Sequence, residues 1–271
     1  MEHLLNEFET QGWIVLDLPD KNPIFKARDL LQKELNSLTS KTIPLEEYHN
    51  LAENDEYHTD MQYKLTAFFR QERFAYKIIS AQVDFFKKFI GNDLFVQKNP
   101  YLRMTRPLKP QDNIGYHRDT FYGGSPYELS VLVPFVELNE KNSLSVMNGS
   151  HTLSEKLFPT DRIENPDKSV VKGSQKHQMG FLYAPKLMDP AVREKMKPIP
   201  LKLGQVLIFS LSTVHGSIVN ESNRTRWSSD MRVLNALAPV DLSARPEYYE
   251  PLCFSPVTRS AQKYFKNNES Q

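Results

Sequence analysis

The chain has 271 residues, which allows one large domain or two small ones, and it carries 34 Lys and Arg against 33 Asp and Glu. The formal charge of +1 gives no reason to expect nucleic acid or an anionic membrane as a partner, and the single cysteine excludes an internal disulfide and a thiolate zinc cluster. The N-terminus lacks a basic start followed by an apolar core, and no apolar run of about 18 residues occurs. We therefore expect no signal peptide, no membrane span and a cytoplasmic protein.

Helical patterns dominate the first third of the chain. Residues 4–11 and 22–38 predict two helices, and residues 13–16 predict a strand between them. Apolar residues at helical spacing between 60 and 90 predict one long helix or two in line, and Gly91 is a fitting end for this segment.

Short strand patterns follow Gly91, and Gly, Pro and Asn separate them. Such a series of short strands with turn signals favours a barrel or a sandwich. A further segment, residues 142–151, begins as a strand and ends in an Asn-Gly turn. The other strand-like segments are residues 94–96, 101–104, 115–120, 129–138, 201–212 and 225–237.

Two segments of the second half have little strand or helix pattern. Residues 152–200 are long and rich in proline, which is typical of a lid or a binding loop, and equally of a surface excursion without a role. Residues 241–271 are expected to wrap the barrel and to end in a short helix. We interpret residues 1–271 as one domain, with a helical part to about residue 91 and a barrel from about 92 to 240.

The segment N-I-G-Y-H-R-D-T, residues 113–120, places His117 and Asp119 two positions apart. In an extended strand such residues point to the same face, so an imidazole and a carboxylate can reach one metal ion. An apolar run downstream ends on His215, which is the best third ligand. Two histidines and one carboxylate with open coordination positions form the facial triad of non-heme iron(II) oxygenases.

An arginine on the next predicted strand extends this site. If residues 214–220 and 224–233 formed a hairpin, Arg226 would lie opposite Ser217 and about 7 Å along the sheet from His215, which matches the length of a five-carbon diacid. Guanidinium binds carboxylate through two parallel bonds, and the hydroxyl of Ser228 faces the same way. Arg232 has the same parity but lies about 20 Å further along the strand, so we expect it to pair with an acidic side chain.

Other motifs compete with this interpretation and are weaker. H-R-D also opens the protein-kinase catalytic loop, but position 124 is Gly124 where that loop requires Asn. A second H-x-D, His58 to Asp60, lies in a helical stretch and is expected on a solvated face. His151 is expected to be structural, and His177 to be exposed.

Two other functional classes remain open. A hydrolase or isomerase could use zinc or manganese at the same three ligands, although the diacid spacing of Arg226 counts against it. A catalytically silent barrel could act as a binding module, although its signature would be a missing ligand. Bound metal and the appearance of succinate would separate these classes.

Several segments together resemble a known family. The chain resembles the iron(II)/2-oxoglutarate dioxygenases of the phytanoyl-CoA dioxygenase type in three successive motifs: H-R-D, then G-Q-V-L-I-F-S-L-S-T-V-H-G-S, then R-W-S. F-E-T-Q-G-W-I-V-L near the start and V-P-F-V-E-L-N-E-K-N-S-L-S-V-M-N-G-S-H are similar to further segments of that family. The family usually has Gly where this chain has Asn142 or Ser143, and Pro in place of Asn148. The resemblance covers residues 4 to about 237, without the middle insertion.

The resemblance implies a mainly β fold, the double-stranded β-helix (a jelly-roll, cupin-like barrel), with helices packed outside. It implies metal binding by His117, Asp119 and His215. It assigns the distal carboxylate of 2-oxoglutarate to Arg226, with lesser contributions from Ser217 and Ser228. It also implies a polar co-substrate contact from a strand before H-R-D, for which Arg103 is our choice and Thr105 and Arg106 are rivals.

The activity that the resemblance implies uses Fe(II), 2-oxoglutarate and O2. It is the hydroxylation of a small molecule with decarboxylation of 2-oxoglutarate to succinate, and the retained Asp119 carboxylate favours hydroxylation over halogen transfer. Aromatic and polar side chains flank the metal motif and suit a small polar metabolite; they are Tyr116, Arg118, Phe121, Tyr122 and Tyr127.

Overall fold

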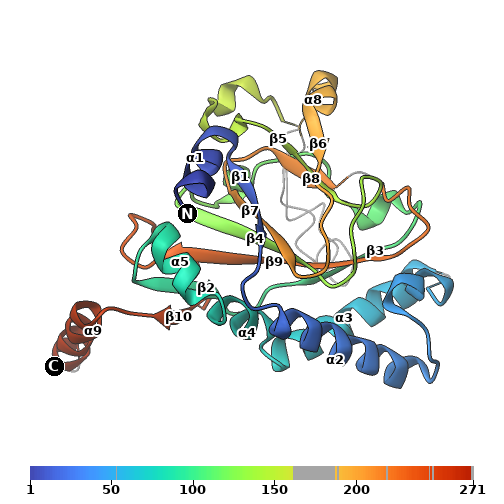
Figure 1. Cartoon of the computed structure of the whole chain (residues 1–271), viewed down its shortest axis with the longest axis horizontal. Coiled ribbons are helices and arrows are strands. Elements are labelled where there is room, and N and C mark those ends of the chain that lie inside the picture. The colour runs from blue at the N-terminus through green and yellow to red at the C-terminus, as the bar shows by residue number, and fades with distance from the viewer. Residues whose placement is uncertain are drawn as a thin grey trace.

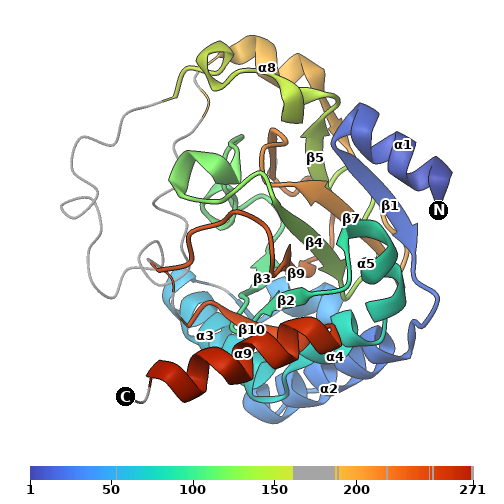
Figure 2. The same ribbon diagram turned by 90° about the vertical axis from the view of Figure 1, so that its left-hand side faces the viewer.

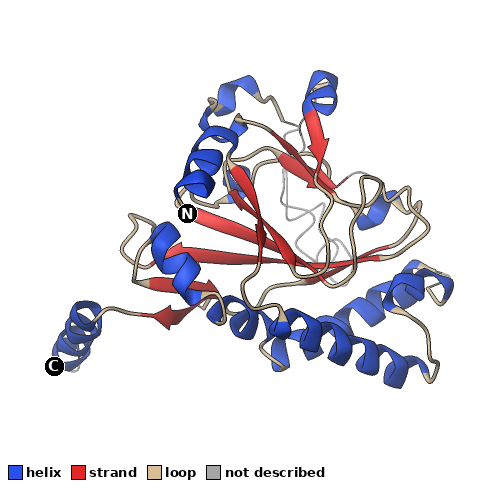
Figure 3. Cartoon of the chain, in the orientation of Figure 1, coloured by secondary structure: helices blue, strands red, loops and turns tan. Residues whose placement is uncertain are grey.

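Two antiparallel β-sheets face each other in the computed structural model, and helices lie along the outer side of the larger sheet (Figure 1, Figure 3). The structure describes residues 1–52, 54–160, 187, 189–217, 219–243, 245 and 247–269. This arrangement confirms the predicted fold class, a mainly β jelly-roll with flanking helices. The extent of the domain over residues 1–271 stays a prediction.

The larger sheet has the order β1-β7-β4-β9-β2-β10, and β3 pairs with β9 beside it. The smaller sheet has the order β6-β5-β8. The strands of the larger sheet are β1 (Trp13–Asp17), β2 (Leu94–Gln97), β3 (Leu102–Thr105), β4 (Glu128–Pro134), β7 (Gln205–Ser210), β9 (Arg226–Asn235) and β10 (Tyr249–Cys253). Those of the smaller sheet are β5 (Leu144–Met147), β6 (Met196–Pro198) and β8 (His215–Ser217).

The helices gather mainly on one side of the larger sheet. Figure 2, turned by 90°, shows α2, α3 and α4 together beneath the strands. The helices are α1 (Glu2–Gln11), α2 (Asn22–Thr39), α3 (Asp55–Gln71), α4 (Phe74–Ser80), α5 (Val83–Ile90), α8 (Pro190–Lys195) and α9 (Pro256–Glu269). Short 3-10 turns are η1 (Leu45–Asn50), η2 (Pro110–Asp112), η3 (Asp119–Tyr122), η4 (Ser150–Thr152) and η5 (Glu155–Leu157). None of the helices that the structure describes is long and apolar enough to cross a bilayer.

The region between residues 60 and 90 differs from the prediction of one or two helices in line, because three helices occupy it. Arg73 adopts a left-handed φ of 53° between α3 and α4, which ends the first helix there. The reversal brings Phe74 back onto Phe69, with ring centroids 5.3 Å apart. The predicted end at Gly91 is confirmed, since α5 stops at Ile90 and Gly91 has φ 107°.

Strand β9 separates the core from the pocket, because alternate side chains of a strand point to opposite faces. Trp227 and Met231 are buried on the helix side, where the Trp227 ring contacts Tyr48 edge-on at 5.6 Å and its Nε1–H donates to the Leu45 carbonyl at 2.7 Å. The opposite parity carries Arg226, Ser228, Asp230 and Arg232. One strand thus packs the apolar core with one face and lines the space between the sheets with the other.

The C-terminal segment lies against the barrel through β10, which pairs with β2, and α9 then projects from the body (Figure 1). The expected lid falls largely outside the described residues. The described parts of residues 152–200 contain η5, α8 and β6.

Gly12 forms a tight corner between α1 and β1. Its φ is 82°, in the left-handed region that favours glycine, and its carbonyl accepts hydrogen bonds from Thr213 Oγ1 at 2.9 Å and from the Ser210 amide at 3.0 Å. A Cβ atom added at Gly12 would lie 2.5 Å from His151 Nδ1. The corner therefore requires glycine both for its backbone conformation and for space.

We expect Gly12→Ala to lower the free energy of unfolding by about 2 to 5 kcal/mol, because left-handed strain and overpacking add. Gly123 is the matched control, since its φ is 100° but no atom lies within 4 Å of an added Cβ. Gly123→Ala should cost only the backbone part, about 1 to 2 kcal/mol. Urea denaturation measures both, and equal losses would show that the contact with His151 is unimportant.

Candidate metal centre

Two histidines, His117 just before η3 and His215 at the start of β8, face each other in the lining of one pocket. His117 and His215 form an isolated antiparallel bridge in which each amide donates to the carbonyl of the other residue, both at 2.9 Å. The ring centroids lie 4.4 Å apart. Backbone pairing therefore fixes the distance between two imidazoles that are 98 positions apart in the chain (215 minus 117).

The carboxylate of Asp119 completes the group. Its Oδ1 lies 3.5 Å from His117 Nε2 and 3.6 Å from His215 Nε2, and candidate ligand atoms of all three buried residues lie within 4.8 Å of one another. The predicted strand over 115–120 is wrong as a regular element, since Asp119 already begins η3. Arg118 between the two residues is nevertheless extended, with φ −114° and ψ 144°, so the same-face argument holds locally.

Backbone carbonyls orient both rings. His117 Nδ1 lies 2.7 Å from the Gly115 carbonyl, and His215 Nδ1 lies 2.9 Å from the Thr213 carbonyl. A carbonyl only accepts hydrogen bonds, so each Nδ1 carries the proton and each Nε2 presents its lone pair toward Asp119. Burial, followed by the neighbouring His117, lowers the pKa of His215 to about 4, which keeps this ring neutral as a metal ligand must be.

Arg232 holds the second oxygen of Asp119. Its Nη2 donates to Asp119 Oδ2, and its Nη1 donates to Ser130 Oγ. Burial alone would raise the pKa of Asp119, but Arg232 and the two histidines outweigh it and hold the pKa well below its usual range. The expected acidic partner of Arg232 is thus Asp119 itself, and Arg232 lies in the pocket instead of remote from it.

Arg226 occupies another part of the same pocket and is 3% exposed. Its Nη2 donates to Ser217 Oγ at 2.8 Å, and its Nη1 lies 3.4 Å from the Asn142 carbonyl. Among the described residues, Arg226 Nε and the hydroxyl of Ser228 have no hydrogen-bond partner, and no carboxylate forms an ion pair with Arg226. Burial lowers the pKa of Arg226 to about 10, which leaves the guanidinium charged at neutral pH.

The hairpin that placed Arg226 opposite Ser217 is wrong, although the contact between the two residues exists. β8 pairs with β5 in the smaller sheet, and β9 pairs with β2, β3 and β4 in the larger one. Arg226 reaches Ser217 across the space between the sheets. The jelly-roll crosses from one sheet to the other at this point, where a local hairpin was the simpler expectation.

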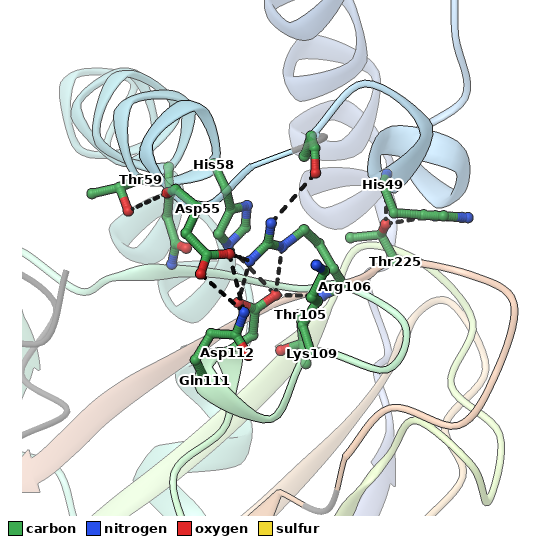
Figure 4. Close-up of polar contacts among 12 residues, drawn as sticks. His49, Asp55, His58, Thr59, Thr105, Arg106, Lys109, Gln111, Asp112 and Thr225 are labelled. Atoms are coloured by element: carbon green, nitrogen blue, oxygen red, sulfur yellow. Dashed lines mark hydrogen bonds and ion pairs between the residues drawn. The ribbon is translucent and has the colours of Figure 1, made fainter.

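Strand β3 supplies the polar side chains before the metal motif. Arg103 is the cross-strand partner of Ser228 and Thr105 that of Arg226, so both share the pocket face of β9. Arg103 lines the pocket, and its Nε donates to Asp230 Oδ2 at 2.5 Å. Arg106 points the other way, toward the start of α3, where it binds Asp112 and Asp55 (Figure 4).

Residues outside the metal motif also differ in place from expectation. His58 is fully buried and not on a solvated face, because its Nδ1 contacts Tyr48 Oη at 3.2 Å inside the helical layer. His151 is structural as expected, with its Nε2 donating to the Glu9 carbonyl at 3.1 Å. His177 lies outside the described residues. Tyr127 is 58% exposed, which removes it from the pocket wall.

Three of the flanking side chains, those of Tyr116, Arg118 and Phe121, form a separate cluster. Tyr116 and Phe121 pack with Phe158, and the guanidinium of Arg118 lies over the Phe158 ring at 4.3 Å. Arg118 donates to the carbonyls of Leu153 and Ser150, so it points away from His117 and Asp119. This cluster lies beside the metal centre and is available to shape a substrate site.

Three polar residues of the site escaped the sequence argument, namely Asp112 and Asp230, which line the pocket, and Ser130, which accepts a hydrogen bond from Arg232. Asp230 had a signal, since it shares the parity of Arg226 and Ser228 on β9. Asp112 and Ser130 had none, because loop and strand packing bring Asp112 to the pocket and Ser130 to Arg232 from other parts of the chain.

We expect Arg232→Ala to weaken metal binding by about 10- to 100-fold, which is the usual effect of removing a group that orients a ligand. Competitive titration of Fe(II) against a colorimetric chelator under nitrogen measures this. Arg245→Ala is the control, because Arg245 binds Glu128 at 2.9 Å on the same sheet and lies outside the pocket lining. An unchanged metal affinity of the Arg232 variant would remove its orienting role.

Comparison with known proteins places this geometry in context. The family model for phytanoyl-CoA dioxygenase matches residues 27–228. Solved structures of similar fold include the non-heme monooxygenase ThoJ in its apo form, with 15% identity, a TM-score of 0.57 and coverage of 93% of this chain and 84% of that chain. A search of curated protein sequences finds no match.

Two further solved structures share the fold. The epimerase SnoN, in complex with Fe3+, alpha ketoglutarate and nogalamycin RO, has 14% identity and a TM-score of 0.53, with 87% of this chain and 83% of that chain covered. EctD from S. alaskensis has 16% identity and a TM-score of 0.52, with 89% and 79% covered. At these identities the likeness concerns the fold alone.

Proposed function

This chain belongs to the phytanoyl-CoA dioxygenase family, and we propose that it is an iron(II)/2-oxoglutarate-dependent oxygenase that hydroxylates a small polar metabolite. One observation carries the proposal. A cluster of two histidines and a carboxylate shares a buried pocket with Arg226, a guanidinium for which the described residues provide no carboxylate partner.

The donor set fits iron(II). His117 and His215 would each contribute Nε2, and Asp119 would contribute Oδ1, because Arg232 occupies its other carboxylate oxygen. This leaves one ligand atom from each residue and open positions for further ligands, as the facial triad requires. With 2-oxoglutarate bound, iron(II) supplies the activation of O2 and the oxidation of a substrate C–H bond.

The donors around Arg226 fit the distal carboxylate of 2-oxoglutarate. Arg226 would donate through Nε and a terminal nitrogen, and Ser228 would donate its hydroxyl hydrogen, which has no acceptor among the described residues. Ser217 holds the guanidinium in place through Nη2. Arg103 would contribute a further contact on the same wall, while its Nε stays on Asp230.

The competing classes are weaker for the same reasons. A hydrolase or isomerase on this barrel would have no evident use for the buried guanidinium of Arg226, which lines the same pocket as the three metal-ligand candidates. A binding module without catalysis would be expected to lack a ligand, whereas this chain presents all three side chains together.

The function is tested by incubating the protein with Fe(II), 2-oxoglutarate and O2 and measuring succinate. We expect succinate and CO2 to appear together, only when all three are present, and to be lost in His215→Ala. Addition of the true substrate should accelerate the reaction, with one oxygen atom of O2 in succinate and the other in a new hydroxyl group. Metal-dependent hydrolysis of a candidate substrate without 2-oxoglutarate would instead support the hydrolase.

We expect Arg226→Ala to weaken 2-oxoglutarate binding by about 2 to 5 kcal/mol, because a buried charge-assisted pair is lost. Ser228→Ala, which removes one neutral donor, should cost only about 0.5 to 1.5 kcal/mol. Anaerobic calorimetry with the Fe(II)-loaded protein measures both. If the Arg226 variant bound 2-oxoglutarate with wild-type affinity, the distal carboxylate would have to be assigned to Arg103 instead.

A further inference from the structure

A second buried carboxylate, that of Asp112, lies in the wall of the pocket that contains Arg226. Its side chain is fully covered. A bare negative charge there would repel a dicarboxylate co-substrate, since charges interact strongly where solvent is excluded. The pocket therefore needs a cation that neutralises Asp112 without occupying the place of the ligand.

Arg106 is that cation. It follows Thr105, the cross-strand partner of Arg226, and its side chain lies between Asp112 and Asp55 of α3, outside the pocket lining (Figure 4). Its Nε donates to Asp112 Oδ2 at 2.9 Å, its Nη2 donates to Oδ1 at 2.8 Å, and its amide donates to Oδ2 at 2.9 Å. Nη2 also donates to Asp55 Oδ1 at 2.6 Å, which fixes the guanidinium to the first turn of α3.

The other neighbour of Asp112 contributes no charge. His58 Nε2 lies 3.7 Å from Asp112 Oδ2, and burial lowers the pKa of His58 to about 4, so the ring is neutral at neutral pH. Tyr48, on the far side of His58, is likewise neutral, because burial raises the pKa of its phenol. Arg106 thus provides the positive charge that faces Asp112.

Each acidic side chain in the pocket lining forms an ion pair with an arginine other than Arg226. Asp119 pairs with Arg232, Asp230 pairs with Arg103, and Asp112 pairs with Arg106. In the described part of the chain, Arg226 is left with neutral contacts only, those to Ser217 and Asn142. Each of these three carboxylates thus pairs with a guanidinium other than Arg226, and Arg106 also binds the exposed Asp55. Arg226 remains for a carboxylate that the ligand supplies.

We propose that Arg106 is a positioning residue that sets the preference for a dicarboxylate co-substrate by neutralising Asp112 beside Arg226. This inference rests on the proposed function, because it assumes that 2-oxoglutarate binds at Arg226. Arg106 does not touch the co-substrate and acts through Asp112.

The test compares two ligands on the Fe(II)-loaded protein by anaerobic calorimetry, namely 2-oxoglutarate and 2-oxobutanoate, which lacks the distal carboxylate. Arg106→Gln should weaken 2-oxoglutarate by about tenfold or more and 2-oxobutanoate much less. Arg106→Lys keeps the charge and should retain most of the affinity. Adding Asp112→Asn to Arg106→Gln removes both charges and should restore 2-oxoglutarate binding to within about threefold of wild type.

Loss of a buried partner destabilises a fold strongly, so thermal unfolding is recorded for every variant. If Arg106→Gln does not fold, the double variant and Asp112→Asn carry the test, and both should bind 2-oxoglutarate at least nearly as well as wild type. Arg245→Gln breaks an ion pair outside the pocket lining and should leave both affinities unchanged.

Equal weakening of both ligands in Arg106→Gln would overturn the inference, as would a double variant that folds and fails to bind 2-oxoglutarate. A wild-type protein that binds metal but not 2-oxoglutarate would overturn the proposed function itself. If the wild type binds 2-oxoglutarate and substitution of Arg106 does not change the preference between the two ligands, the proposed function stands and only this inference is overturned.

Discussion

Charge buried between the two sheets is the constraint on which the site depends. A carboxylate or guanidinium taken out of water is several kcal/mol less stable unless a partner replaces the lost hydration. Strand β9 meets this constraint through its period of two, since Arg226, Ser228, Asp230 and Arg232 all face the pocket. Two of these four side chains pair with charges from other strands and loops, which fixes the wall before any ligand arrives.

The same strand depends on the helical layer behind it. Trp227 fills the core on the other face and donates to the Leu45 carbonyl, and the Thr225 amide donates to the Glu46 carbonyl at 2.7 Å. The two residues that flank Arg226 are thus both anchored in η1. Rigid support of this kind is what a binding side chain needs, because a loose guanidinium would lose conformational entropy when it binds a carboxylate.

The metal centre is arranged by backbone more than by side-chain packing. Reciprocal hydrogen bonds hold His117 opposite His215, and neighbouring carbonyls choose the nitrogen that each ring presents. Thr213, whose carbonyl orients His215, also donates its hydroxyl to the Gly12 carbonyl. The corner at Gly12 therefore supports the metal centre from the outside of the barrel.

The sequence predicted those features of the site that depend on local rules. The spacing of His117 and Asp119 and the parity of Arg226 and Ser228 follow from the geometry of extended chain, and each was found. The partner of Arg232 and the burial of His58 could not be found, because both depend on packing between segments far apart in the chain. The hairpin prediction failed for a related reason, since neighbouring strands of a jelly-roll can belong to opposite sheets.

Helix boundaries show the same division. Gly91 ends α5 as expected, because glycine ends a helix through its own backbone freedom. The break at Arg73 had no such signal, since a non-glycine residue takes a left-handed conformation there, next to Phe74, which packs on Phe68 and Phe69. A helix end that depends on the residue itself can be predicted from the sequence, whereas one that tertiary contacts stabilise cannot.

The most direct measurement is a crystal structure of the protein prepared anaerobically with Fe(II) and 2-oxoglutarate, with anomalous diffraction recorded at the iron edge. One anomalous peak is expected within bonding distance of His117 Nε2, His215 Nε2 and Asp119 Oδ1, with the distal carboxylate of 2-oxoglutarate on Arg226 and with Asp112 still on Arg106. An iron peak elsewhere, or a co-substrate carboxylate bound away from Arg226, would contradict the pairing of charges on which the site is argued to depend.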